Sequence, residues 1–78
     1  MLRKPAALIT GASGEIGHGL IARLADGGDR PVITLDLKPL DPELGRLVTR
    51  EFSGSILDGN LLERILSEFE VDLVFHLA

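Results

Sequence analysis

Gly11-Ala12-Ser13-Gly14-Glu15-Ile16-Gly17 is the stretch that decides the fold, because three glycines recur at intervals of three after a short apolar run. The run 6–10 predicts a buried strand, and apolar residues at helical spacing follow the glycines. At such a turn one glycine makes the tight bend, the next lets backbone N–H groups approach a phosphate, and the third lets helix and strand pack. The helix N-terminus adds unpaired N–H groups and a partial positive charge. The stretch therefore predicts a site for the pyrophosphate of a dinucleotide.

An acidic residue stands at the distance that such a site requires. Asp36 closes the apolar run 32–35, nineteen positions after Gly17. In dinucleotide sites a carboxylate about 20 residues beyond the glycines, at the end of the second strand, binds the ribose hydroxyls. The alternative is a structural glycine-rich turn, with Asp36 merely starting a loop. The order of strand, glycines, helix and acid favours the dinucleotide.

The composition describes one small domain of 78 residues, with a net charge of −4 and no cysteine. The negative charge argues against binding nucleic acid or an anionic membrane surface through a basic face. The two histidines lie far apart and there is no thiolate, so no metal site is evident. No signal peptide is evident, and no apolar run approaches the ~18 residues of a membrane span. We therefore expect a soluble cytoplasmic protein.

Strands and helices are predicted to alternate along the chain. The predicted strands are 6–10, 32–35, 47–52 and 71–77. The predicted helices are 15–25, a short turn within 41–46 that has Pro42 at its first position, and the stripe 61–69. This alternation implies an α/β fold, a partial Rossmann fold whose parallel sheet of about four strands has flanking helices. Right-handed crossovers favour the strand order 3-2-1-4, with the ligand crevice at the carboxyl ends of the strands.

Local signals refine these elements. Glycines 27 and 28 are expected to end the first helix. Arg50 and Glu51 predict that the third strand lies at a sheet edge, where charge discourages unwanted pairing. Asn60 with Glu63 three residues later predicts a capping box at the start of the last helix.

Four segments of the sequence form one pattern: the turn 10–17, Asp36, the segment Gly54-Ser55-Ile56-Leu57-Asp58, and the last strand 71–78. Together they closely resemble the extended short-chain dehydrogenase/reductase family, which includes NAD-dependent nucleotide-sugar epimerases and dehydratases. This resemblance covers the whole chain. It implies that residues 1–78 are the N-terminal part of a dinucleotide-binding Rossmann domain.

The resemblance implies NAD as the cofactor and assigns its contacts residue by residue. The glycine turn would hold the pyrophosphate. Asp36 and the two residues after it would contact the adenosine ribose, and segment 55–56 would contact the adenine. The end of the chain would line the cofactor. The implied residues are Gly11, Ser13, Gly14, Glu15, Ile16, Gly17, Asp36, Leu37, Lys38, Ser55, Ile56, Leu77 and Ala78. Ser55 departs from the family, which has aspartate there, so its neutral bond to adenine should be weaker.

Ordinary structural roles compete at several polar positions. Ser13 could contact a phosphate oxygen or could simply be a small loop residue. His18 could touch a phosphate, but a solvent-facing helix position is expected. His76 is expected to be packed and hydrogen-bonded rather than an acid or base.

The catalytic residues of the family are absent from this chain. Related enzymes carry a Tyr-x-x-x-Lys pair later in the sequence, and this chain has no tyrosine. We expect the N-terminal fragment of a longer homo-oligomeric enzyme that acts on a sugar nucleotide or other small molecule. A dinucleotide sensor that has lost catalysis, and a small protein with Rossmann-like topology and no ligand, are the alternatives. NAD is expected over NADP, because Asp36 would repel a 2′-phosphate and no arginine adjoins it, although Lys38 could partly offset that repulsion.

Overall fold

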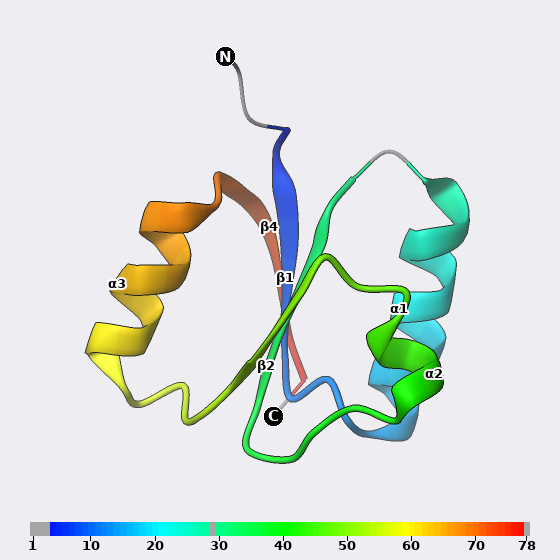
Figure 1. Ribbon diagram of the computed structural model, residues 1–78, viewed down its shortest axis with the longest axis horizontal. Coiled ribbons are helices and arrows are strands. Elements are labelled where there is room, and N and C mark those ends of the chain that lie inside the picture. The colour runs from blue at the N-terminus through cyan, green and yellow to red at the C-terminus, as the bar shows by residue number, and fades with distance from the viewer. Residues whose placement is uncertain (1–3, 29, 78) are drawn as a thin grey trace.

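Four parallel strands form one sheet in the residues that the computed structural model describes, 4–28 and 30–77 (Figure 1). The strands are β1 Ala6–Thr10, β2 Val32–Asp36, β3 Arg50–Ser53 and β4 Val71–His76, in the order β3-β2-β1-β4. In the pairing of β1, Leu8 lies opposite Ile33 on one side and Val74 on the other. The predicted α/β class and the strand order 3-2-1-4 are confirmed.

Helices cover both faces of this sheet. α1 Glu15–Gly27 and α2 Pro42–Gly45 lie on one face, and α3 Gly59–Glu68 lies on the other (Figure 1). Successive strand residues point to opposite faces, so Leu8 packs in the apolar cluster beneath α3 while Ile9 packs in the cluster beneath α1. Because all four strands are parallel, each segment that follows a strand emerges at the same end of the sheet, the end formed by the carboxyl ends of the strands.

The third strand begins later than predicted. It starts at Arg50 rather than at residue 47, because the N–H of Leu47 donates to the Leu44 carbonyl and continues the turn after α2. β3 does lie at the sheet edge, as its charges predicted. Arg50 also packs there: its guanidinium lies 4.6 Å from the ring centre of Phe52 and 3.0 Å from the Glu68 carboxylate.

The start of α3 also differs from the prediction, and the expected capping box is wrong. The carboxylate of Asp58 accepts the Leu61 N–H at 3.1 Å, so Asp58 is the N-cap and Asn60 already lies in the first turn. Asp58 satisfies an N–H that helix geometry leaves without a partner. The other helix predictions hold within two residues: α1 ends at Gly27 and is followed by Gly28 in a left-handed conformation, and α2 has Pro42 in its first turn.

β4 lies at the opposite edge of the sheet from β3. Its outer edge pairs with no strand of the described residues, and Val74 is 57% exposed. None of the helices in this described part of the chain is long and apolar enough to cross a membrane.

Candidate functional site

A small cavity lies where the carboxyl ends of β1, β2 and β3 meet. Its volume is about 120 Å³, and three segments that are distant in sequence line it. The lining residues are Gly11, Leu35, Asp36, Leu37, Gly54, Ser55 and Ile56. The structure thus brings together the glycine turn, the acid that ends β2 and the segment after β3, all of which the sequence singled out.

The glycines of the turn differ in what surrounds them. Gly11 has a φ of 70°, a conformation that L side chains rarely adopt, and its N–H donates to the Leu35 carbonyl at 2.9 Å. A Cβ at Gly17 would overlap the carbonyl of Ala12, so this glycine lets α1 pack against the turn. A Cβ at Gly14 would meet no atom of the described residues within 4 Å. The turn is therefore closed by protein at Gly17 and open at Gly14.

The open side of the turn coincides with the N-terminus of α1. Gly14 is the N-cap, and no side chain of the described residues caps the helix. Glu15 and Ile16 follow in the first turn, and the Ile16 side chain is 74% exposed. The first N–H groups of α1 therefore carry the partial positive charge of a helix start on an accessible surface.

Asp36 joins the end of β2 to the glycine turn. Its Oδ2 accepts two hydrogen bonds from Ser13, at 3.0 Å from the backbone N–H and at 2.8 Å from the hydroxyl. Its Oδ1 accepts the Lys38 N–H at 3.1 Å. Partial burial raises the pKa of Asp36, but hydrogen bonds from Ser13, Lys38 and Leu37 lower it more, so the pKa lies below the ordinary 3.8. The group is therefore a fixed carboxylate at neutral pH.

The segment after β3 supplies the remaining wall of the cavity. Ile56 packs partly on the cluster beneath α3, while Leu57 is 89% exposed. The Ser55 hydroxyl accepts the Leu57 N–H at 3.0 Å, which holds the turn. One acceptor position of that hydroxyl is thus already used inside the protein.

The end of β4 lies beside the end of β1. The Leu77 N–H donates to the Thr10 carbonyl at 2.9 Å, and Thr10 Oγ1 and His76 Nδ1 share a hydrogen bond of 2.6 Å. His76 is therefore hydrogen-bonded as predicted, but it is exposed rather than packed, because β4 is an edge strand. Ala78, the last predicted contact residue, lies outside the described residues.

Two contacts that the sequence analysis missed hold the loop after Asp36. The Glu51 carboxylate accepts the Leu40 N–H at 2.8 Å, and His18 Nε2 lies 3.6 Å from the Asp41 carboxylate. The His18 side chain is thus partly exposed, as expected for a solvent-facing helix position, but it also faces the Asp41 carboxylate. The only sequence signal for the Glu51 contact was a charged residue within a predicted strand. That charge was equally well explained by the position of β3 at the sheet edge.

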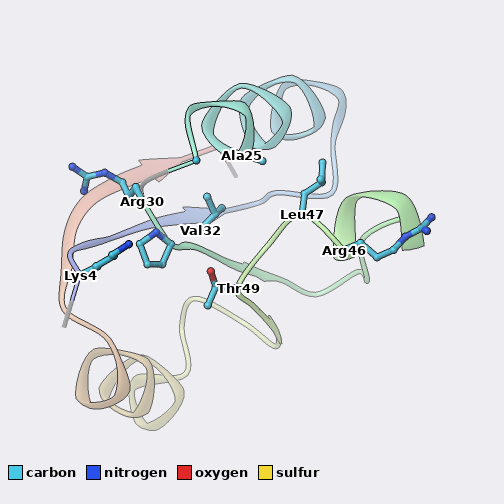
Figure 2. A pocket seen from close by; sticks show the side chains of 9 residues that line it. Lys4, Ala25, Arg30, Val32, Arg46, Leu47 and Thr49 are labelled. Carbon is cyan, nitrogen blue, oxygen red and sulfur yellow. The ribbon is translucent and has the colours of Figure 1, made fainter. Parts of the chain in front are cut away.

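A larger cavity, of about 350 Å³, lies at the other end of the sheet, where Pro31 and Thr49 precede β2 and β3 (Figure 2). Lys4, Arg30 and Arg46 are among its lining residues. Figure 2 shows the Arg30 and Arg46 guanidinium groups directed away from the cavity, and Arg30 forms an ion pair with Asp72. The guanidinium groups of Arg30 and Arg46 therefore do not converge on a common point in this cavity, so we take the smaller cavity as the candidate site.

Comparison with known proteins gives one family match. The model of the NAD dependent epimerase/dehydratase family matches residues 7–78. No curated protein sequence matches the chain.

Solved structures agree with this match. UDP-glucose 4-epimerase from Thermotoga maritima, solved with UDP-glucose, is 35% identical with a TM-score of 0.79, over 94% of this chain and 24% of that one. MoeE5, solved with UDP-glucuronic acid and NAD, is 32% identical with a TM-score of 0.72, over 94% and 22%. L-threonine dehydrogenase from Phytophthora infestans, at 24% identity, a TM-score of 0.72 and the same coverage, shows a likeness of fold. The chain spans about a quarter of the length of these structures.

Proposed function

Because the chain belongs to the NAD-dependent epimerase/dehydratase family, we propose that it is the NAD-binding portion of a nucleotide-sugar epimerase, a dehydratase or a related oxidoreductase. The observation that carries this proposal is the cavity at the carboxyl ends of the strands, where Gly11, Asp36 and Ile56 meet. MoeE5, one of the similar structures, was solved with NAD. Ligands of open α/β sheets bind at this edge.

The residues of this edge fit the parts of a dinucleotide. The open space at Gly14 and the uncapped start of α1 suit the pyrophosphate. The Asp36 carboxylate suits the ribose hydroxyls, and the cavity wall at Ser55 and Ile56 suits the adenine. When bound, NAD would supply the group that accepts and returns hydride. The residues of this chain would hold and orient it.

The whole protein's activity on a sugar nucleotide is part of the same proposal. UDP-glucose 4-epimerase and MoeE5 were solved with UDP-sugars, which supports this substrate class. Within this proposal, only the binding of NAD is argued from the described residues of this chain.

Calorimetric titration of the purified protein with NAD and with NADP tests the proposal. We expect NAD to bind more tightly, because the Asp36 carboxylate would repel a 2′-phosphate while accepting ribose hydroxyls. Equal or tighter binding of NADP would contradict the choice of NAD. Binding of neither dinucleotide would contradict the proposed function.

A further inference from the structure

The loop after β2 contributes Leu37 to the wall of the small cavity. The Leu37 side chain is 72% exposed, so packing does little to fix its place. Its position depends instead on the backbone of residues 37–40, which belong to no helix or strand. At the start of this loop, the Asp36 carboxylate accepts the N–H groups of Leu37 and Lys38. The loop is thus fixed at its first end by the carboxylate of the candidate site.

Leu40 fixes the other end of the loop. Its side chain is 8% exposed and packs in the apolar cluster beneath α1. Its part-buried N–H donates to Glu51 Oε2 at 2.8 Å. A shielded N–H that loses its acceptor is costly, and Leu40 lies outside any helix or strand that could supply another. The place of the loop therefore depends on a side chain of β3.

Glu51 reaches the loop because of its place in the sheet. It lies opposite Thr34 in the pairing of β2 with β3. A Cβ at Gly45 would lie 3.6 Å from its Oε1, so its carboxylate lies on the face that carries α2. A second contact, between His18 Nε2 and the Asp41 carboxylate, is 3.6 Å long, which exceeds a hydrogen bond. Glu51 is therefore the stronger anchor of the loop.

We infer that Glu51 is a positioning residue for the cofactor, because its hydrogen bond to the Leu40 N–H keeps loop 37–40 where Leu37 forms one wall of the cavity. This inference rests on the proposed function, in which the loop borders the adenosine half of NAD. Among the described residues, Glu51 does not line the cavity itself, so it acts through the loop. If the loop populates a second arrangement, only the fraction with Leu37 in place binds, and the apparent affinity falls by that fraction.

Three substitutions of Glu51, an exposed residue of an edge strand, separate its reach from its charge. Glu51→Ala removes the acceptor, Glu51→Asp keeps the charge on a shorter side chain, and Glu51→Gln keeps an oxygen at the same length. Glu63→Ala, in α3 on the other face of the sheet, is the matched control (Figure 1). We expect calorimetry to show that Glu51→Ala and Glu51→Asp bind NAD about three- to tenfold more weakly. Glu51→Gln and Glu63→Ala should stay within about twofold of the unsubstituted protein.

AMP, which carries the adenosine half alone, gives a second readout. Its affinity should fall by the same factor as that of NAD, because the loop borders that half. Amide hydrogen exchange by NMR without any ligand gives a third: the Leu40 N–H should exchange faster in Glu51→Ala and remain protected in Glu51→Gln.

The outcomes separate the inference from the proposed function. The inference is wrong, while the proposed function stands, if folded Glu51→Ala and Glu51→Asp bind NAD as the unsubstituted protein does. It is also wrong if Glu51→Gln loses as much affinity as Glu51→Ala, or if NAD binding weakens while AMP binding does not. If the unsubstituted protein binds no dinucleotide, the proposed function fails and the inference fails with it, whatever the exchange rates.

Discussion

At the scale of the residue, Asp36 connects the parts of the candidate site. Its two oxygens receive hydrogen bonds from the glycine turn before α1 and from the loop after β2. The turn and the loop come from different parts of the chain, so the carboxylate fixes their distance from each other. A substitution of Asp36 is therefore expected to alter the site and the local structure together.

The pH dependence of folding follows from these hydrogen bonds. The pKa of Asp36 in the folded protein lies below 3.8, so the folded state binds its proton less readily than the unfolded chain does. The resulting stability is complete above the unfolded pKa of about 3.9, and it is lost as the pH falls through the folded value.

Urea unfolding between pH 2 and pH 6 measures this contribution. We expect the free energy of unfolding to decrease on acidification, and to decrease less steeply in Asp36→Asn, which has no carboxyl to protonate. Identical pH profiles for the two proteins would show that Asp36 is not held in its charged form by the fold.

At the scale of the element, the start of α3 shows how two nearby capping signals compete. Asp58 and Asn60 are both residues that favour a helix N-cap, and the sequence pattern alone favoured Asn60 because of Glu63. In the structure the Asp58 carboxylate reaches the Leu61 N–H, and Asn60 is inside the helix. The helix therefore begins two residues earlier than a cap at Asn60 requires.

Alanine substitutions at these two positions distinguish the caps. We expect Asp58→Ala to reduce the free energy of unfolding by about 1 kcal/mol, because the Leu61 N–H loses its acceptor. Asn60→Ala, the matched control, should change it little or raise it slightly, since alanine favours a helix interior. Thermal unfolding followed by circular dichroism measures both. A larger loss in Asn60→Ala than in Asp58→Ala would favour the capping box instead.

At the scale of the whole molecule, the strand order was predictable because it depends on the alternation of strands and helices, and the position of the glycines placed the candidate site at the carboxyl ends of the strands. The start of β3 was not predictable, because the Leu47 N–H donates to the Leu44 carbonyl within the turn after α2, and the strand begins only after that turn. The partner of Ser13 was not predictable either. Its hydrogen bonds to Asp36 depend on how the turn folds back against the end of β2, which the sequence does not display.

The exposed edge at β4 is a property of the whole sheet. Leu73 and Val74 are 38% and 57% exposed, and the outer edge of β4 has no strand partner in the described residues. Unpaired apolar edges are templates for association between chains. We expect the purified 78-residue chain to self-associate as its concentration rises, and Val74→Lys to shift it toward monomer. Sedimentation velocity would contradict this expectation if the unsubstituted chain remained monomeric at all concentrations.

The central claim is that a dinucleotide binds at the glycine turn, and one pair of variants tests it most directly. Gly14 and Gly19 both have open space where a Cβ would lie, so valine at either position should leave the fold intact. Only Gly14 lies where the pyrophosphate would approach the N-terminus of α1. We expect calorimetry to show NAD binding abolished in Gly14→Val and retained in Gly19→Val, with both variants folded by circular dichroism. Normal NAD binding by a folded Gly14→Val protein would contradict the account.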